Sequence, residues 1–152
     1  MRCRVIEVSY AAGVCDAAGN EILRSIAELG VRGVEAVTVV NLYRIEGDLS
    51  EEEVRRIARE ILADRISQKS RIRRCGSRRI QGRYAEVWLK PGVTDPVAET
   101  TVRAIRDIGI RTEVSVATGI RYLFSGNVSR QTVDTICSSL LVNSLIHDYS
   151  VG

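Results

Sequence analysis

The sequence predicts an α+β protein built from two tandem copies of one βαββαβ unit. When the 152-residue sequence is shifted by 79 positions, identical residues of its two halves fall in one register without a gap. Each copy also alternates runs of β-branched residues with amphipathic stretches that begin at a capping residue. Hydrophobic residues make up 45% of the chain and charged residues 27%, which is typical of a folded globular protein.

The internal repeat sets the predicted domain organisation. Identical residues stand in one register from Glu7 and Glu86 to Leu62 and Leu141, mostly turn glycines, caps and core aliphatics. We predict repeat 1 at 1–74, a basic linker at 75–83 and repeat 2 at 84–152. A copy of about 70 residues has little core of its own. We therefore expect the copies to form a pair related by a pseudo-two-fold axis.

The first half of each copy predicts a strand, a turn and a capped helix. Strands are expected at 4–9 and 84–89, followed by the turns AAGVCD and KPGVTD. The motif residues of these turns and caps are Gly13, Val14, Asp16, Gly92, Val93, Asp95 and Pro96. Each aspartate is predicted to be an N-cap that accepts from an amide two or three residues further on. A small-ligand role of the turns stays open, because helix N-terminal amides attract anions.

The second half of each copy predicts two strands, a helix and a closing strand. The middle strands are expected at 34–40 and 42–46 in repeat 1, and at 113–118 and 121–125 in repeat 2. The second helices are expected to begin at Ser50 and Ser129. Short closing strands are expected at 70–73 and 149–152.

No pattern in the sequence indicates catalysis, a metal or a cofactor. The cysteines Cys3, Cys15, Cys75 and Cys137 form no CxxC pair, and His147 is the only histidine. We therefore expect no metal site, and buried or semi-buried free thiols in a reducing cytoplasm rather than disulfides. No phosphate-binding glycine motif is present. The sequence also has no membrane-length apolar run, which predicts a cytoplasmic protein without membrane contact.

The candidate docking residues are basic and aromatic. Seven basic residues crowd the segment 69–83, and among them we single out Arg73, Arg74, Arg78 and Arg79. The segment is interpreted as a solvated linker, a docking surface for an acidic protein, or a site for RNA or phosphorylated ligands. It contains no aromatic residue, so nucleic acid is the least favoured partner. Tyr43, Tyr122 and Trp88 are interpreted as core or interface aromatics.

The second copy carries a resemblance to a known family. The run AEVWLKPGVTDPVAETTVRAIRDIGI resembles the opening of the PurS-type small subunit of phosphoribosylformylglycinamidine (FGAM) synthase. The residues that match its motif are Lys90, Gly92, Val93, Asp95, Pro96 and Gly109. The first copy keeps Gly13, Val14, Asp16 and Gly30 but has Ala12 and Ala17 at the two proline positions. The later segments resemble the N-terminal domain of large-subunit synthases that carry the unit twice.

The resemblance implies a ferredoxin-like fold and a non-catalytic role in purine biosynthesis. It implies a component of an ATP-dependent glutamine amidotransferase complex that helps a glutaminase and a synthetase associate, so that ammonia passes between them. The basic linker departs from the shorter, acidic or neutral connection expected in that family. One alternative is a tandem ACT-like domain that binds an amino acid, and a weaker one is an RNA-binding module. Homo-oligomerisation is left open.

Overall fold

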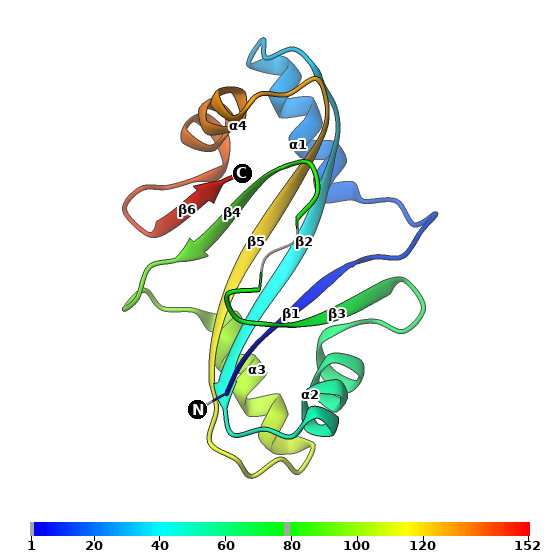
Figure 1. Cartoon of the computed structure of the whole chain (residues 1–152), viewed down its shortest axis with the longest axis vertical. Coiled ribbons are helices and arrows are strands. Elements are labelled where there is room, and N and C mark those ends of the chain that lie inside the picture. Colours follow the sequence, from blue (N-terminus) through cyan, green and yellow to red (C-terminus); the bar gives the residue numbers. More distant parts are fainter. Residues whose placement is uncertain (1, 78–79) are drawn as a thin grey trace. The chain divides into compact units, whose positions relative to one another are not determined.

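The computed structural model describes residues 2–77 and 80–152, and the same elements follow one another in both repeats (Figure 1). Repeat 1 contains β1 (Arg2–Tyr10), α1 (Ala17–Glu28), β2 (Val34–Gly47), α2 (Glu51–Ile57), the π-helical segment η1 (Ala58–Leu62) and β3 (Gln68–Arg74). Repeat 2 contains β4 (Arg83–Leu89), α3 (Pro96–Asp107), β5 (Ser115–Gly126), α4 (Arg130–Ile136), the π-helical segment η2 (Cys137–Leu141) and β6 (His147–Val151). In the described part of the chain, no helix is long and apolar enough to span a membrane.

The two middle strands predicted in each repeat are one continuous strand. The predicted break is wrong in repeat 1, where β2 runs through Asn41, and in repeat 2, where β5 runs through Gly119. A tight hairpin needs two turn residues, usually with positive φ. Only one residue separates the two predicted strands of repeat 1. Neither Asn41 nor Gly119 has positive φ. Counted as two segments each, β2 and β5 keep the predicted β-α-β-β-α-β order, and the α+β class is confirmed.

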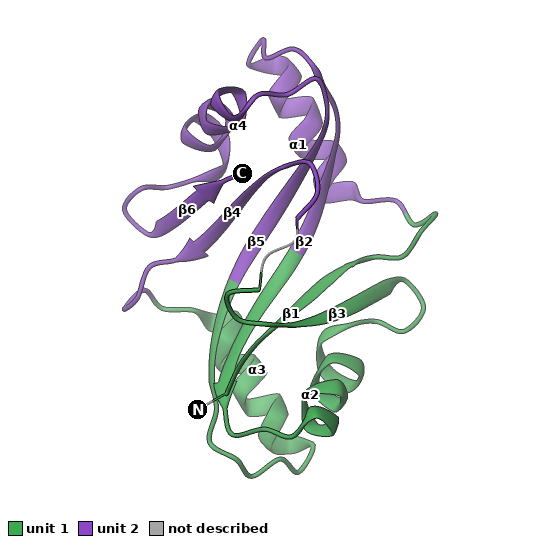
Figure 2. Ribbon diagram, viewed as in Figure 1, with its two compact units in different colours: residues 1–14, 41–78, 94–118 green, residues 15–40, 79–93, 119–152 purple. Residues whose placement is uncertain are grey.

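The compact units of the structure cut across the sequence repeats (Figure 2). Unit 1 consists of residues 1–14, 41–78 and 94–118, and unit 2 of residues 15–40, 79–93 and 119–152. Each boundary inside β2 and β5 falls at the junction between the two predicted strands. Unit 1 therefore contains α3 from repeat 2, and unit 2 contains α1 from repeat 1. The predicted ranges 1–74 and 84–152 describe sequence copies, while each compact unit draws on both.

Each unit has the strand order of a ferredoxin-like sheet. The strands lie in the order β3-β1-β2-β5-β4-β6, and β1 pairs antiparallel with both β2 and β3, as β4 does with β5 and β6. Unit 1 thus has β3, β1, the second half of β2 and the first half of β5 as neighbours. In a βαββαβ unit this is the order 4-1-3-2, with α3 and half of β5 supplied by repeat 2. Unit 2 has the same order with α1 and half of β2 supplied by repeat 1.

Each unit has its own hydrophobic core. In unit 1, Ile6 and Ile45 of the sheet pack with Ile57 of α2 and Ile105 of the exchanged helix α3, and all four are at most 1% exposed. The core of unit 2 is formed by equivalent positions, which include Ile26, Val87, Phe124, Val133 and Ile136. The helix supplied by the other repeat therefore contributes a fully buried isoleucine to each core, which explains why α1 and α3 carry regular apolar stripes.

The second helix of each repeat ends in a π-helical turn. The amide of Ala63 donates to the carbonyl of Ala58 at 3.0 Å, and that of Val142 to the carbonyl of Cys137 at 2.9 Å. Both bonds span five residues, as in a π-helix. After each turn the backbone becomes extended and enters the loop that leads to the closing strand.

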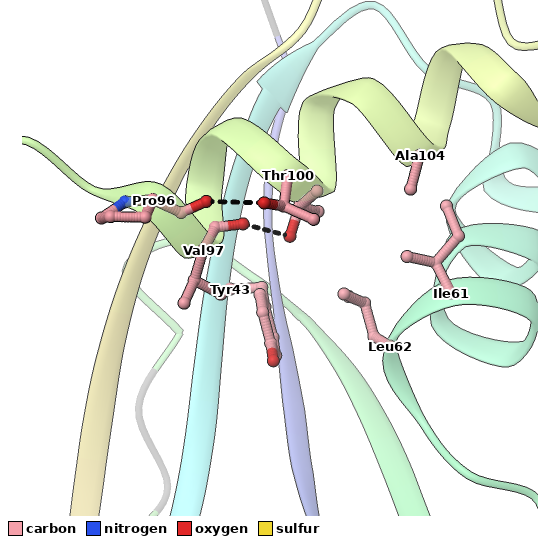
Figure 3. A pocket seen from close by; sticks show the side chains of 8 residues that line it. Tyr43, Ile61, Leu62, Pro96, Val97, Thr100 and Ala104 are labelled. Atoms are coloured by element: carbon pink, nitrogen blue, oxygen red, sulfur yellow. Dashed lines mark hydrogen bonds between the residues drawn. The ribbon is translucent and has the colours of Figure 1, made fainter.

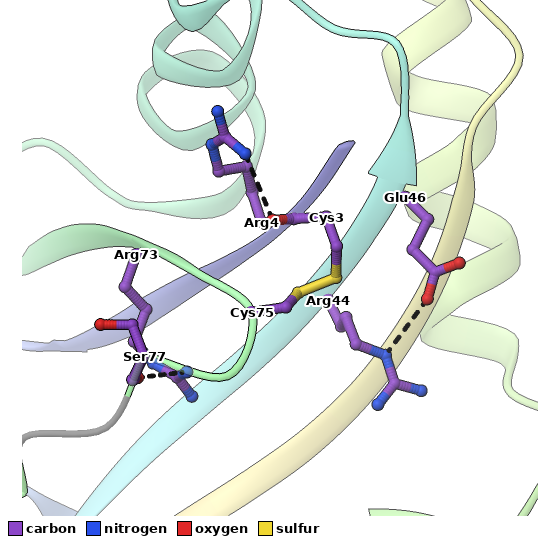
Figure 4. Close-up of a disulfide and its surroundings, with 7 residues drawn as sticks. All are labelled: Cys3, Arg4, Arg44, Glu46, Arg73, Cys75 and Ser77. Carbon is purple, nitrogen blue, oxygen red and sulfur yellow. Dashed lines mark hydrogen bonds and ion pairs between the residues drawn. A yellow bond between two sulfur atoms is a disulfide. The ribbon is translucent and has the colours of Figure 1, made fainter. Parts of the chain in front are cut away.

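A disulfide joins Cys3 to Cys75, so the prediction of free thiols is wrong for these two residues (Figure 4). The β1–β3 register pairs Arg4 with Arg74, which places Cys3 directly opposite Cys75 one step further along. Their Cα atoms are 5.5 Å apart, a distance normal for a disulfide. Cys15 and Cys137 carry free thiols, as predicted, and Cys137 is buried; the expectation of a buried or semi-buried thiol is wrong for Cys15, which is exposed at the turn before α1.

Candidate functional site

The turns that carry the sequence motif are built the same way in both repeats. Asp16 accepts from the amide of Gly19 at 2.8 Å, and Asp95 accepts from the amide of Ala98 at 3.0 Å. Both aspartates are therefore N-caps that bind an amide three residues on, as predicted. Pro96 occupies the first turn of α3, also as predicted.

The same aspartates make a second contact that the sequence analysis missed. The other carboxylate oxygen of Asp16 accepts from the amide of Val39 at 2.9 Å. That of Asp95 accepts from both the amide and the hydroxyl of Thr118, at 3.1 and 2.7 Å. Each carboxylate thus joins its helix to the half-strand that follows it. Asp16 thus fixes α1 to the first half of β2 within unit 2, and Asp95 fixes α3 to the first half of β5 within unit 1.

The turn glycines have the backbone conformation that the motif requires. Gly13 has φ +82° and Gly92 has φ +87°, which side-chain-bearing residues rarely adopt. The amides of Val14 and Val93 close the two turns on the carbonyls of Ala11 and Lys90, at 3.1 Å each. Gly13, Val14, Gly92 and Val93 therefore form tight turns that lead from the first strand of each repeat to its helix cap.

A buried ion pair lies on β4 and β5 of unit 2. Arg121 donates to Glu86 at 3.1 Å, and both side chains are 5% exposed. The indole N–H of Trp88 donates to the other oxygen of Glu86 at 2.9 Å. The ring of Trp88 lies over Gly119, where a Cβ atom would come within 2.6 Å of the indole. Trp88 is thus half-buried and makes its contacts within unit 2. The sequence signal for a buried ion pair was the glutamate that recurs at positions 7 and 86.

The equivalent glutamate of unit 1 binds one of the predicted docking residues. Arg73 donates to Glu7 at 2.8 Å and to the carbonyl of Ser77 at 3.1 Å. The side chains of Glu7 and Arg73 are 11% and 16% exposed. Arg73 is therefore part of the β1–β3 strand pair rather than a freely exposed basic group.

The rest of the basic segment divides between an exposed edge and residues outside the described chain. Lys69, Arg71 and Arg74 are exposed on β3, which lies at the edge of the sheet. Arg78 and Arg79, both predicted docking residues, lie outside the described residues. The structure therefore places one exposed predicted docking residue, Arg74, on the same edge strand as two other exposed cations.

The two repeated tyrosines lie in different surroundings. Tyr122 is 8% exposed in the core of unit 2, and burial raises the pKa of its phenol. Tyr43 is half-buried in unit 1, where burial and then the charge of Asp95 raise the pKa of its phenol. The core interpretation holds for Tyr122, whereas Tyr43 reaches a surface pocket.

That pocket lies in unit 1 between α3 and η1 and has a volume of about 330 Å³ (Figure 3). Apolar side chains dominate its lining, and no charged residue is among them. It is formed by Tyr43, Ile61, Leu62, Pro96, Val97, Thr100, Thr101 and Ala104. The hydroxyls of Thr100 and Thr101 donate to carbonyls one helical turn back, at 2.9 and 2.8 Å, so they are already satisfied. The pocket is therefore suited to an aliphatic group.

The described residues show no cluster of metal ligands, and the buried thiol of Cys137 is poorly reactive. Within residues 2–77 and 80–152, no three His, Cys, Asp or Glu side chains come together as metal ligands. Burial, followed by the charge of Asp134, raises the pKa of Cys137 to about 11. A thiol that stays protonated is a poor nucleophile. The polar groups of the described sites are used to hold helices and strands together.

These features define a class of protein: paired ferredoxin-like units whose motif residues serve as caps and turns. The family model for PurS, phosphoribosylformylglycinamidine (FGAM) synthase, matches residues 4–74 and again residues 84–152. The chain belongs to the PurS family, of which it carries two copies in tandem, and this family takes part in purine biosynthesis.

The solved structures include a protein to which the chain is similar. The chain is similar to the Methanocaldococcus jannaschii PurS protein, one of the subunits of formylglycinamide ribonucleotide amidotransferase in the purine biosynthetic pathway. The identity is 24% and the TM-score 0.40, over 46% of this chain and 90% of that chain. None of the curated proteins matches the chain.

Proposed function

We propose that this chain is a non-catalytic assembly component of FGAM synthase, which helps the glutaminase and the synthetase associate for ammonia transfer. The observation that carries the proposal is the family match over both 4–74 and 84–152. The use of the motif aspartates supports it, because both carboxylates bind the chain's own amides. A component with this role works where purine synthesis takes place, so we place it in the cytoplasm.

We further propose that the basic edge of unit 1 contributes to docking. Lys69, Arg71 and Arg74 are exposed on the edge strand β3. Exposed charges of one sign mainly raise the rate of association with a partner of opposite charge, and salt screens them. Arg78 and Arg79 extend the same run of sequence. The expected partner surface on the synthase is therefore acidic.

The test measures association of the purified chain with purified synthetase and glutaminase by surface plasmon resonance. Lys69, Arg71 and Arg74 are changed together to Glu in one variant. The matched control carries Arg24→Glu, Arg32→Glu and Arg103→Glu, which changes the net charge equally at exposed positions elsewhere. We expect the first variant to associate about tenfold more slowly at low salt. Equal slowing in both variants would show that net charge, not the β3 edge, governs docking.

A wild-type chain that binds neither synthase component would contradict the assembly role itself. Tight, steeply salt-dependent binding of RNA by the same wild-type sample would favour the nucleic-acid alternative. The two results are separated by using one preparation of protein for all three probes.

A further inference from the structure

The Cys3–Cys75 disulfide joins the ends of β1 and β3, where the chain leaves repeat 1. The strand ladder ends here with the pair Arg4 and Arg74. One step further, the amide of Cys75 donates to the carbonyl of Cys3 at 3.3 Å. Because β3 is the edge strand and pairs with β1, the disulfide is the outermost link between this end of β3 and the sheet.

The disulfide also holds the turn that follows β3. The amide of Ser77 donates to the carbonyl of Arg74 at 3.2 Å. The guanidinium of Arg73 donates to the carbonyl of Ser77 at 3.1 Å (Figure 4). Cys75 lies inside this turn, so its bond to Cys3 ties the turn 74–77 to β1.

Unit 2 shows that the closing strand of such a unit does not need a cross-link. β6 pairs with β4 as β3 pairs with β1, and Gly82 stands at the position equivalent to Cys3. The amide of Tyr84 donates to the carbonyl of Gly152 at 3.0 Å, and the amide of Gly152 donates to the carbonyl of Tyr84 at 3.1 Å. Backbone hydrogen bonds thus close this strand pair, and we expect unit 1 to stay folded when its disulfide is opened.

The disulfide can be reduced by a small thiol such as glutathione. Both cysteines are half-buried, and the next residues in the chain, Gly76 and Ser77, are exposed. The thiolate of one glutathione attacks a cysteine sulfur and forms a mixed disulfide, while the other cysteine leaves as a thiolate. A second glutathione resolves the mixed disulfide. The S–S bond is broken, each cysteine gains one electron and one proton, and the two glutathiones become one disulfide.

We propose that Cys3 and Cys75 form a reversible thiol–disulfide switch that fixes the turn 74–77 when oxidised and releases it when reduced. Disulfides in the cytoplasm are typically transient or redox-sensing, because glutathione keeps thiols reduced there. The proposal therefore rests on the cytoplasmic location given under the proposed function.

The switch has a consequence for docking, because Arg74 belongs to the basic edge that we propose as a docking surface. A side chain that is already fixed loses less conformational entropy when it binds. The oxidised chain should therefore bind an acidic partner more tightly than the reduced chain does.

The first experiment equilibrates the full chain with mixtures of reduced and oxidised glutathione and counts free thiols by mass spectrometry after an acid quench. Cys15→Ser serves as the background, because it removes the exposed free thiol. We expect the chain to pass from the disulfide to the dithiol across these mixtures while it stays folded. A chain that keeps its disulfide in a large excess of reduced glutathione carries a permanent cross-link, which overturns the proposal. A chain that never forms the disulfide in an excess of oxidised glutathione overturns it equally.

The second experiment measures amide hydrogen exchange by NMR in the oxidised and reduced chain. The amides of Cys75 and Ser77 should exchange about tenfold faster after reduction, because the end of the strand then opens locally. The amides of Tyr84 and Gly152 are the internal control and should not change. Cys3→Ser, kept under oxidising conditions, should exchange like the reduced chain at Ser77. Equal exchange of Cys75 and Ser77 in both redox states overturns the proposal.

Surface plasmon resonance with the synthetase and the glutaminase tests the consequence for docking. We expect the dissociation constant of the reduced chain to be about tenfold higher than that of the oxidised chain. Cys3→Ser should match the reduced chain. Equal binding by both redox states overturns the link between the switch and docking. If neither state binds, the proposed docking role is wrong, and the glutathione titration and the exchange rates decide the switch by themselves.

Discussion

The two units share their caps and register but secure their sheets by different side chains. In unit 1 the Cys3–Cys75 disulfide and the Glu7–Arg73 ion pair join β1 to β3. In unit 2, Trp88 packs on Gly119, the ring of Tyr84 lies against Gly152, and Tyr149 donates to Asp134. The repeated residues are those that form turns, caps and core. The contacts that differ involve strand residues, where either a cross-link or aromatic packing can perform the same structural task.

The largest difference we expect is between the two glutamate–arginine pairs. Glu86→Ala removes the acceptor of both the Arg121 guanidinium and the Trp88 indole from a site where Glu86 is 5% exposed, and loss of a buried carboxylate of this kind costs about 3–5 kcal/mol. Glu7→Ala affects a pair that is 11% and 16% exposed, so water can compensate and the loss should be less than half as large. Urea unfolding of both variants checks this. Equal losses would mean that burial does not distinguish the pairs.

The disulfide should stabilise unit 1 alone. It closes a loop with a sequence separation of 72, which corresponds to about 4 kcal/mol when the cross-link is removed. Cys75→Ser should therefore unfold at lower urea concentration than oxidised wild type, and reduced wild type should behave like the variant. Repeat 2 provides the contrast, because Gly82 stands at the position equivalent to Cys3. Wild type whose unfolding is insensitive to reductant, with both thiols free by mass spectrometry, would refute the cross-link.

Loss of the Asp95 cap should destabilise the protein more than loss of the Asp16 cap, because Asp95 accepts one additional hydrogen bond. Asp16→Ala loses two hydrogen bonds and should cost about 1 kcal/mol, whereas Asp95→Ala loses three and should cost about 2 kcal/mol. Thr118→Val isolates the hydroxyl bond and should remove most of the difference. The free energies of unfolding of the three variants check the order. If Asp16→Ala proves the more costly, the extra hydroxyl bond contributes nothing measurable.

The smallest effect separates the two free cysteines. Cys15 is exposed and should react readily with a maleimide near neutral pH. Burial raises the pKa of Cys137 to about 11, so at pH 8 only about one molecule in a thousand carries the thiolate. One label per folded chain is expected. Rapid labelling of both thiols in the folded state would show that Cys137 is accessible.

The raised pKa of Cys137 also determines how the stability of the folded protein changes with pH. The folded state holds the thiol proton more tightly than the unfolded state, whose pKa is near 9.0. The contribution of the neutral buried thiol is therefore fully present below pH 9 and is lost as the pH rises toward 11. Cys137→Ala should reduce this part of the alkaline loss, which urea unfolding at several pH values can measure.

Local chemistry was predictable from the sequence, and pairing between distant segments was only partly so. The caps at Asp16 and Asp95 and the turns at Gly13 and Gly92 followed from residue type and spacing, because they depend on neighbours in the chain. The continuity of β2 was also accessible in principle, since the single residue Asn41 is too short for a hairpin turn. This continuity is what carries α1 into unit 2 and α3 into unit 1.

The remaining features depend on strand register, which the repeat alone does not give. Cys3 and Cys75 are opposite each other only because β1 and β3 pair as they do. The contact of Glu86 with Arg121 likewise follows from the β4–β5 register. The pocket of unit 1 combines η1 from repeat 1 with α3 from repeat 2, so neither repeat alone contains it.

The most direct test of the assembly role compares two nitrogen sources in a reconstituted FGAM synthase reaction, with and without this chain. We expect the synthetase to use free ammonia equally well in both cases, whereas glutamine should support product formation only when the chain is present with the glutaminase. If the glutamine-dependent rate is the same without the chain, the chain does not bring the two enzymes together and the proposed function is wrong.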